Sequence, residues 1–135
     1  MSKRIVKNIF ENTENDKIAI SSENNSKINY RDLKIFVEDI SKQLSGNGIS
    51  NKDRAAIVLP NGPSMATSFL GISSYMSAAP LNPSYKSEEY EFYLKDLNPK
   101  IIIVKKNSNN SSIEIAKKLK IEICEIKINK NEPEG

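Results

Sequence analysis

The spacing of hydrophobic residues changes several times along the chain, and each spacing predicts a different element. Residues 16–30 contain two short apolar runs around a polar, Asn-rich turn, which predicts a small β-hairpin. Further along, apolar side chains recur every three or four positions, which predicts a helix. The apolar positions of this helix are Tyr30, Leu33, Phe36, Val37, Ile40 and Leu44. Asn29 is placed to cap its start, and the glycines of GNG, residues 46–48, are placed to end it.

Two continuous apolar runs, RAAIVLP at 54–60 and KIIIV at 100–104, have the length of strands. Because they do not alternate with polar residues, they predict strands covered on both faces, as in a parallel sheet. Shorter strands are predicted at AAPL, 78–81, and at IEICEIKI, 121–128. Strand and helix alternate four times. The pattern therefore predicts an α/β fold, with a mostly parallel sheet flanked by helices and a small N-terminal β-hairpin.

The helices between these strands have predicted buried faces and ends. The second helix is expected to bury Met65, Phe69, Ile72 and Met76, and the third to bury Tyr90, Tyr93, Leu94 and Leu97. Ser87 is the predicted N-cap of the third helix, and Glu88 and Glu89 follow it where the helix dipole favours negative charge. Pro99 disfavours helical backbone at the residue before it and so predicts the helix end. A short helix is expected within SIEIAKKLK, residues 112–120.

The length of 135 residues fits one domain. We expect residues 1–16 to be an irregular N-terminal segment, 17–126 a single α/β domain, and 127–135 a polar tail. Hydrophobic residues make up 38% and charged residues 27% of the chain, which is typical of a globular protein. The net charge of +3 comes from scattered lysines, so no nucleic-acid surface is expected. No apolar stretch approaches the roughly 20 residues of a membrane span and no secretion signal is visible, which predicts a cytoplasmic protein without a membrane contact.

Side chains that could carry chemistry are sparse. Histidine is absent, which excludes His-based triads and His metal sites, and the single cysteine, Cys124, is interpreted as an incidental thiol on a strand. The glycines of SGNGIS follow a helix and precede a strand, the reverse of the order in dinucleotide-binding motifs. Neither a Gly-Lys-Ser/Thr phosphate loop nor a Gly-x-Ser-x-Gly motif occurs. We interpret Glu88, Glu89 and Glu91 as compensation of a helix dipole, so no catalytic and no metal-ligating residue is predicted.

The ends of the predicted strands offer the best-placed candidates for a ligand site. In open parallel sheets, ligands lie beyond the carboxyl ends of the strands. The segments NGP, NPSY and KKN occupy these positions. Asn61, Asn82 and Tyr85 are therefore the candidate residues of a ligand crevice. The alternative interpretation is that Asn-Gly and Asn-Pro occur here because they form turns well.

Several segments occur in the same order in a known family. They are INYRDL (28–33), GISNKD (48–53), AAIVLPNG (55–62) and AAPLNPSYKSEEYEFYL (78–94). Together they resemble the N-terminal portion of adenylate-forming (AMP-binding) enzymes, the superfamily of acyl-CoA synthetases and related ligases, over roughly residues 17–125. The last segment is most similar to the branch that includes oxalate–CoA ligases. The chain departs from the family pattern at Asn29, where Thr is usual, and at Lys52, where Gly is usual.

The resemblance implies an enzyme that activates a small carboxylic acid with ATP and Mg²⁺, releases pyrophosphate, and passes the acyl group from AMP to coenzyme A. The family's phosphate-binding loop, Mg²⁺-binding acid, ribose-binding Asp and C-terminal Lys have no counterparts here, so the chain alone is expected to be inactive. Its expected partner is the remainder of the ligase or a complementing polypeptide. The alternatives are a standalone α/β binding or regulatory module derived from that family, one piece of a split ligase, and an unrelated flavodoxin-like nucleotide binder.

Overall fold

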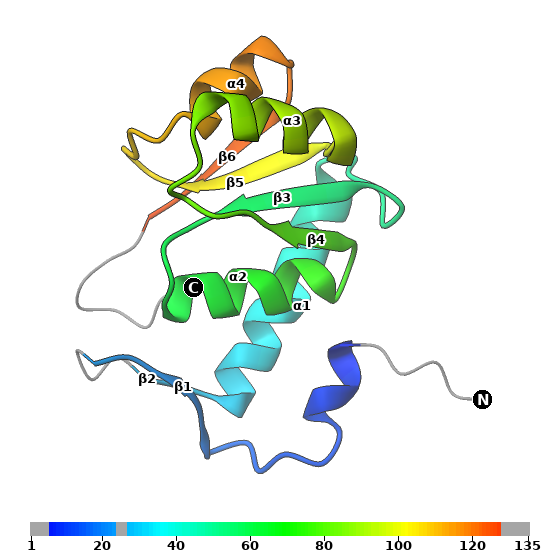
Figure 1. Ribbon diagram of the computed structural model, residues 1–135. Coiled ribbons are helices and arrows are strands. Elements are labelled where there is room, and N and C mark those ends of the chain that lie inside the picture. Colours follow the sequence, from blue (N-terminus) through cyan, green and yellow to red (C-terminus); the bar gives the residue numbers. More distant parts are fainter. Residues whose placement is uncertain (1–5, 24–26, 128–135) are drawn as a thin grey trace.

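The computed structural model describes residues 6–23 and 27–127 (Figure 1). The elements in chain order are η1 (Val6–Phe10, a 3₁₀ helix), β1 (Ile18–Ser21), β2 (Lys27–Asn29), α1 (Tyr30–Gly46), β3 (Arg54–Val58), α2 (Pro63–Ser73), β4 (Ser77–Pro80), α3 (Ser87–Leu97), β5 (Ile101–Lys105), α4 (Ser112–Lys118) and β6 (Glu122–Ile126). Part of the predicted hairpin turn and nearly all of the predicted polar tail lie outside the described residues. Within the segment predicted to be irregular, η1 forms a short 3₁₀ helix.

Four strands form the parallel sheet that the apolar runs predict. Their spatial order is β4-β3-β5-β6, and every neighbouring pair is parallel. Ala56 of β3 is paired with Ala79 of β4 on one side and with Ile102 of β5 on the other. Ile103 of β5 is paired with Cys124 of β6. β1 and β2 form a separate antiparallel hairpin, as predicted, and β4 and β6 are the two edges of the larger sheet.

Helices cover both faces of the sheet, which explains why its central strands contain no alternating polar residues. α1 and α2 lie on one face, and α3 and α4 on the other (Figure 1). Ala55 and Ile57 of β3 pack in the cluster with α1 and α2, whereas Ala56 and Val58 pack in the cluster with α3 and α4. Successive side chains of a strand point to opposite faces, so the burial of the four residues from Ala55 to Val58 in β3 requires both helical layers.

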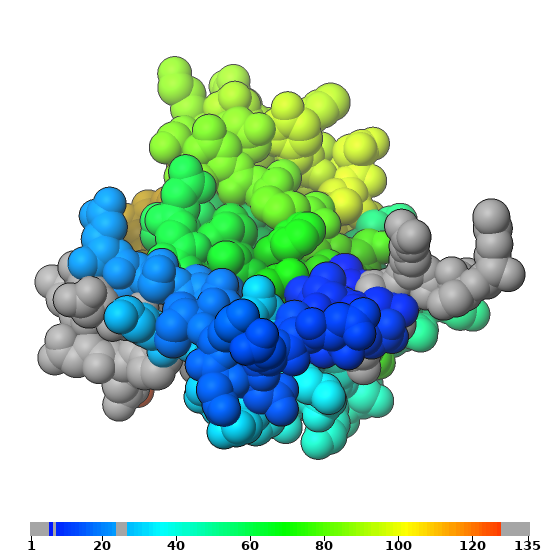
Figure 2. All heavy atoms as spheres, turned by 90° about the horizontal axis from the view of Figure 1, so that it is seen from below, coloured from blue at the N-terminus to red at the C-terminus, as the bar shows by residue number. Residues whose placement is uncertain are grey.

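The N-terminal elements pack against the start of α1. Ile28, Leu33 and Val37 form a separate apolar cluster, and Phe10 of η1 and Leu70 of α2 pack against it. Figure 2 shows the N-terminal segment and the hairpin, in blue, spread across the face seen from below. This cluster attaches the hairpin to the helical layer formed by α1 and α2.

Both predicted ends of α1 are confirmed. The Oδ1 atom of Asn29 accepts a hydrogen bond from the N–H of Asp32 at 2.8 Å, so Asn29 is the N-cap. The helix ends at Gly46, and the side chain of Asn47 donates a hydrogen bond to the carbonyl oxygen of Gln43 at 2.7 Å. Gly48 follows in the left-handed region with φ 75°, where glycine is favoured.

The start of α3 corrects the sequence prediction by one residue. The N-cap is Lys86, and Ser87, the predicted cap, is the first helical residue. A lysine side chain has no acceptor, but the carboxylate of Glu89 accepts a hydrogen bond from the N–H of Lys86 at 2.9 Å. The predicted end is confirmed, because α3 stops before Asn98, which adopts the left-handed conformation with φ 46° and ψ 59° next to Pro99.

Two aromatic residues that were predicted to be buried are partly exposed. Phe69 and Tyr93 are each 39% exposed, and Met76, although buried, lies beyond the end of α2. The helices α1 and α2 approach each other closely, since a Cβ atom added to Gly71 would lie 3.2 Å from Cγ1 of Ile40. α2 therefore carries its smallest residue where it meets Ile40. The ring of Phe69, by contrast, is partly exposed.

Candidate functional site

A hollow at the ends of β3 and β4 brings together two of the three predicted candidate residues. Because β3 and β4 are parallel neighbours, their carboxyl ends meet at the same edge of the sheet. Asn61 follows β3 and Asn82 follows β4, and both line this strand-end hollow of about 420 Å³. The complete lining is Leu59, Asn61, Gly62, Met65, Ala66, Phe69, Pro80, Leu81, Asn82 and Pro83.

The lining of the strand-end hollow is mostly apolar, and α2 supplies one wall. Met65, Ala66 and Phe69 form this wall, so the partly exposed ring of Phe69 faces the hollow. Among the described lining residues none is charged, and the side-chain amides are those of Asn61 and Asn82. The hollow can therefore offer an apolar surface and amide hydrogen bonds to a ligand. Sequence reasoning missed Phe69 here because it placed that residue on the buried stripe of α2.

The loop after β3 turns at a glycine. Gly62 has φ 147° and ψ −172°, a conformation that is essentially restricted to glycine. Pro63 is the first residue of α2, a position where its fixed φ suits the helix. This turn leads directly into the helix and leaves Asn61 exposed at the edge of the sheet.

Asn82 is held by hydrogen bonds close to its own loop. Its Oδ1 atom accepts a hydrogen bond from the N–H of Ser84 at 2.9 Å, and its backbone oxygen accepts one from the hydroxyl group of Tyr90 at 2.8 Å. The first bond is the side-chain turn that the alternative interpretation expects of Asn. The second bond ties the loop to α3, where Tyr90 is fully buried. The fold itself therefore fixes Asn82 at the edge of the hollow.

Tyr85, the third candidate, lies outside the strand-end hollow. Its ring stacks on that of Tyr93, with centroids 5.2 Å apart, and meets that of Tyr90 edge-on at 5.7 Å. A hydrogen bond with Tyr93, together with burial, raises the pKa of Tyr85. Burial, with smaller contributions from Tyr85 and Glu89, raises the pKa of Tyr90 to about 12. Tyr85 therefore supports the loop from the side of α3.

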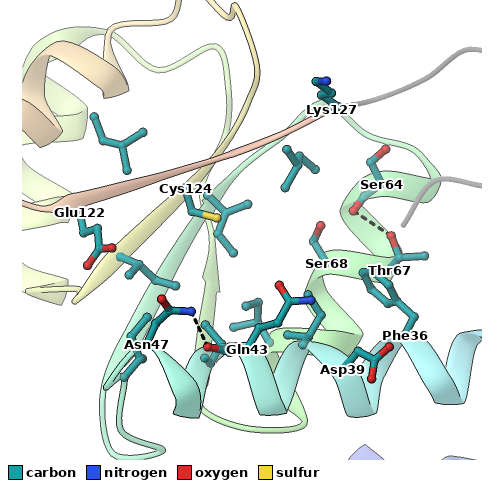
Figure 3. A pocket seen from close by; sticks show the side chains of 18 residues that line it. Phe36, Asp39, Gln43, Asn47, Ser64, Thr67, Ser68, Glu122, Cys124 and Lys127 are labelled. Carbon is teal, nitrogen blue, oxygen red and sulfur yellow. Dashed lines mark hydrogen bonds between the residues drawn. The ribbon is translucent and has the colours of Figure 1, made fainter.

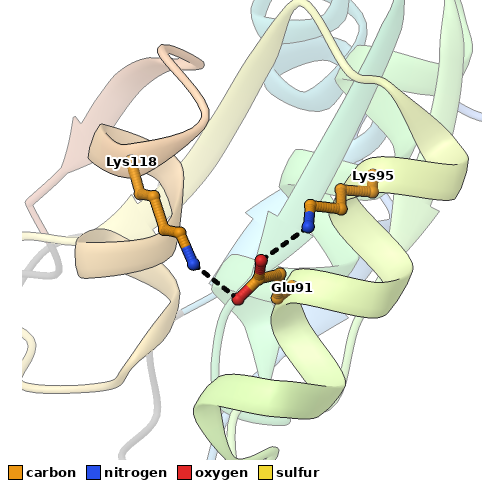
Figure 4. Close-up of polar contacts among 3 residues, drawn as sticks. All are labelled: Glu91, Lys95 and Lys118. Carbon is orange, nitrogen blue, oxygen red and sulfur yellow. Dashed lines mark hydrogen bonds and ion pairs between the residues drawn. The ribbon is translucent and has the colours of Figure 1, made fainter.

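The acidic residues of α3 are engaged in structural contacts. Glu91 accepts hydrogen bonds from the Nζ atoms of Lys95 at 2.6 Å and Lys118 at 2.8 Å (Figure 4). The hydrogen bonds from Lys118 and Lys95 lower the pKa of Glu91 to about 2. The contact with Lys118 joins α3 to α4 across 27 positions of sequence, so local sequence patterns could not predict it.

A second hollow lies between α1, α2 and the strands β5 and β6, and we call it the β6 groove (Figure 3). Its volume is about 530 Å³. Its lining consists of Phe36, Asp39, Ile40, Gln43, Leu44, Asn47, Ile49, Ser64, Thr67, Ser68, Ile72, Ile101, Ile103, Glu122, Ile123, Cys124, Ile126 and Lys127. Partial burial, followed by the nearby Glu122, raises the pKa of the Cys124 thiol. Sequence reasoning placed Cys124 on the same strand face as Glu122 and Ile126 but did not predict a groove there.

The part of the chain that the structure describes lacks two common functional features. It contains no group of three His, Cys, Asp or Glu residues that could hold a metal ion. Within residues 6–23 and 27–127, no helix has the length and apolarity needed to cross a membrane.

Comparison with known proteins connects this fold to a family. The family model described as "AMP-binding enzyme" matches residues 7–134. The chain is 35% identical over 108 residues to an oxalate–CoA ligase of Arabidopsis thaliana and 34% identical over 111 residues to one of Saccharomyces cerevisiae. These matches cover 78% and 76% of the chain but only 21% and 20% of the relatives, so the chain spans about a fifth of their length.

Solved structures share the fold. MatB from Rhodopseudomonas palustris with bound ATP superimposes with a TM-score of 0.75 at 21% identity, covering 90% of this chain and 25% of that one. VinN superimposes with a TM-score of 0.78 at 18% identity, covering 91% of this chain and 32% of that one. The sheet, its flanking helices and the hairpin are thus the fold of the N-terminal domains of adenylate-forming enzymes. Since the family model spans nearly the whole sequence, the chain belongs to the AMP-binding enzyme family.

Proposed function

We propose that this chain is the N-terminal part of an AMP-forming acyl-CoA ligase and that it supplies scaffold rather than catalytic groups. In the complete ligase, a carboxylate would react with ATP to give acyl-AMP and pyrophosphate, and the acyl group would then pass to the thiol of coenzyme A. The observation that carries the proposal is the family match over residues 7–134 in a chain one fifth as long as its ligase relatives.

The residues that line the strand-end hollow are suited to form one wall of a ligand site and not to catalyse adenylation. Adenylation requires groups that position the phosphates and stabilise charge developing at them. ATP with Mg²⁺ does not fit the residues of the hollow by themselves, because the described lining offers two amides and an apolar surface without a cation or a carboxylate. We place Asn61 and Asn82 at the border of a ligand crevice whose charged groups belong to the rest of the ligase, and Tyr85 behind them.

The names of the relatives suggest further properties of the complete enzyme. Two of the relatives are oxalate–CoA ligases, which favours a small carboxylic acid as the substrate. ATP, Mg²⁺ and coenzyme A are the cofactors and co-substrates that the complete enzyme would use. We place the protein in the cytoplasm, in keeping with the absence of a membrane-spanning helix within the described residues.

The first test of this proposal is ATP–pyrophosphate exchange by the chain alone. Oxalate, acetate, and medium- and long-chain fatty acids are supplied as carboxylates, and exchange at the background level is expected with each. The preparation must be free of host ligases. Exchange above background with any of these acids would contradict the proposal, because it would require a complete catalytic site in this chain.

The second test inserts the chain into a complete relative. In this chimera, residues 7–134 replace the matching segment of the Arabidopsis thaliana oxalate–CoA ligase, and we expect exchange with oxalate. The control carries Ala56→Asp, which places a carboxylate at a position that is fully buried between the two helical layers. A chimera that is folded but inactive, together with a stable monomeric chain that melts sharply at high temperature, would favour the standalone module instead.

A further inference from the structure

We propose that Asn61 is a site of spontaneous covalent modification, where Asn61 and Gly62 close to a succinimide that opens to aspartate or isoaspartate. The chain contains the same Asn-Gly pair a second time, at Asn47 and Gly48. Both asparagines are exposed, so access to water does not distinguish them. The hydrogen bonds around the two pairs do distinguish them, and they direct the reaction to Asn61.

The reaction needs no co-reactant other than water. The backbone nitrogen of Gly62 attacks Cγ of Asn61 and forms a C–N bond, and the side-chain nitrogen leaves as ammonia with the proton that Gly62 gives up. Water then opens the cyclic imide. Cleavage between the ring nitrogen and Cγ gives aspartate. Cleavage between the ring nitrogen and the backbone carbonyl carbon gives isoaspartate, in which the main chain runs through Cβ and Cγ.

Both reacting groups are available at Asn61. Within the residues that the structure describes, neither the side-chain amide of Asn61 nor the N–H of Gly62 has a hydrogen-bond partner. A Cβ atom built on Gly62 would meet nothing within 4 Å beyond its chain neighbours, so the nitrogen is not crowded. The pair lies in the loop between β3 and α2. Ring closure can therefore begin without breaking a hydrogen bond of the sheet or of the helix.

At Asn47 the same two groups are engaged. The side-chain nitrogen of Asn47 donates a hydrogen bond to the backbone oxygen of Gln43 at 2.7 Å (Figure 3). The N–H of Gly48 donates one to the backbone oxygen of Ser45 at 3.0 Å. A Cβ atom built on Gly48 would also meet nothing within 4 Å, so crowding does not separate the two sites. Ring closure at Asn47 must first break both hydrogen bonds, and this opposes the reaction.

The product changes the strand-end hollow. Among the described lining residues none is charged, so a carboxylate at position 61 introduces a negative charge at the edge of the hollow. Isoaspartate also lengthens the main chain just before Gly62, whose backbone oxygen accepts a hydrogen bond from the N–H of Ala66 in α2 at 3.1 Å. Under the proposed function, on which this consequence rests, Asn61 borders a crevice for anionic substrates. Conversion should therefore weaken their binding, because like charges repel.

Peptide mapping after incubation at mildly alkaline pH compares the two sites in one molecule. Trypsin releases them in separate peptides, residues 43–52 and 55–86, and mass spectrometry with fragmentation locates the conversion of an amide to an acid. In the second peptide, Asn82 precedes a proline, which has no N–H and cannot close the ring. We expect Asn61 to convert faster than Asn47 by a factor of about ten or more, because two hydrogen bonds protect Asn47. Equal rates, or faster conversion of Asn47, would overturn the proposal.

Guanidinium chloride and a substitution provide the controls. In the unfolded chain, the bonds at Asn47 are lost and the two pairs should convert at similar rates. An undiminished preference for Asn61 would overturn the proposal that the fold directs the reaction. Asn61→Gln should abolish conversion in the peptide of residues 55–86 and leave that of Asn47 unchanged, because glutamine closes its larger ring much more slowly. Conversion that persists in the peptide of residues 55–86 would place the reaction at another residue.

Ageing of the oxalate–CoA ligase chimera tests the consequence for the hollow. Exchange with oxalate should fall in step with the conversion of Asn61, and the chimera with Asn61→Gln should lose a smaller fraction of its own starting rate. Exchange that is retained after full conversion would contradict the effect on substrate binding. A chimera without exchange at the outset would contradict the proposed function, whereas the modification is measured by mass and does not depend on activity.

Discussion

Replacing Tyr90 by Phe tests how the strand-end hollow is attached to α3. The substitution removes the hydroxyl group that donates to the backbone oxygen of Asn82 at 2.8 Å, and it keeps the buried ring. A typical protein hydrogen bond contributes about 0.5–1.5 kcal/mol to the free energy of unfolding. Leaving a buried acceptor unpaired would cost more, but the backbone oxygen of Asn82 also accepts a hydrogen bond from the N–H of Tyr85 at 3.2 Å and so keeps a partner. We therefore expect a loss of about 1 kcal/mol.

Urea unfolding followed by circular dichroism measures this loss. With an m-value of about 1–3 kcal/mol per molar urea, a loss of about 1 kcal/mol lowers the midpoint by about 0.3–1 M. Tyr30→Phe is the matched control, because the hydroxyl of Tyr30 has no hydrogen bond to any residue that the structure describes. If the two variants unfold at the same urea concentration, the bond between Tyr90 and Asn82 does not stabilise the loop.

The same substitution should change the response to alkaline pH. Burial raises the pKa of Tyr90 from 10.0 to about 12, so the unfolded chain releases this proton at a lower pH than the folded chain. The stability associated with the protonated hydroxyl is therefore complete below pH 10 and is lost as pH rises towards about 12. Tyr90→Phe should show a smaller decline in unfolding free energy over this range. An equal decline would show that the hydroxyl is not protected by the fold.

Two further predictions concern packing and charge. Leu94→Ala should lower the unfolding free energy by about 2–5 kcal/mol because Leu94 is buried in the core. Phe69→Ala should lower it clearly less, because Phe69 is 39% exposed. Equal urea midpoints for the two variants would contradict this exposure of Phe69. The pKa of Glu91 is lowered from 4.5 to about 2, so the stability linked to its charge is present above pH 4.5 and is lost as pH falls towards 2. Glu91→Gln should therefore show a smaller fall in unfolding free energy over this acid range. Lys118→Met should also reduce this fall in unfolding free energy at acid pH. An unchanged pH dependence in both variants would show that the ion pair does not contribute to stability.

Most of the fold could be predicted because the sequence pattern follows directly from burial. The continuous apolar runs of β3 and β5 require cover on both faces, and α1 with α2 and α3 with α4 provide it. Asn29 could be identified as a cap because its short side chain reaches the N–H of Asp32. The cap of α3 could not be identified in this way, because the acceptor comes from Glu89, three residues inside the helix, and not from the capping residue itself.

The errors on α2 have a packing origin. The hydrophobic spacing predicted that Phe69 is buried, because such a pattern reflects only the polarity of each residue and not the distance between helices. The distance of 3.2 Å between Ile40 and a Cβ atom built on Gly71 shows that α1 leaves little room for a side chain at that position of α2. Residues such as Ser64 and Thr67 are buried in α2 although their hydroxyl groups are polar. A polar hydroxyl can be buried when it bonds to the preceding turn, as Thr67 does to the backbone oxygen of Pro63.

The candidate site could be predicted only as far as topology determines it. Parallel neighbours end at one edge, so Asn61 and Asn82 line one hollow. The position of Tyr85 depends on the turn after Pro83 and on its stacking with Tyr93, which strand ends do not determine. The β6 groove could not be predicted at all, because the alternation of strands and helices does not reveal how far α1 and α2 extend across the sheet.

The helix α2 connects the two hollows of the molecule. Ser64, Thr67 and Ser68 on one side of it line the β6 groove, while Met65 and Phe69 on another side line the strand-end hollow. It packs closely against α1 at Gly71, where an added Cβ atom would lie 3.2 Å from Cγ1 of Ile40. A larger side chain placed in the groove would therefore press on the same helix that forms a wall of the hollow. Substitutions that fill the groove should consequently affect ligand binding at the strand ends even though they lie outside that hollow.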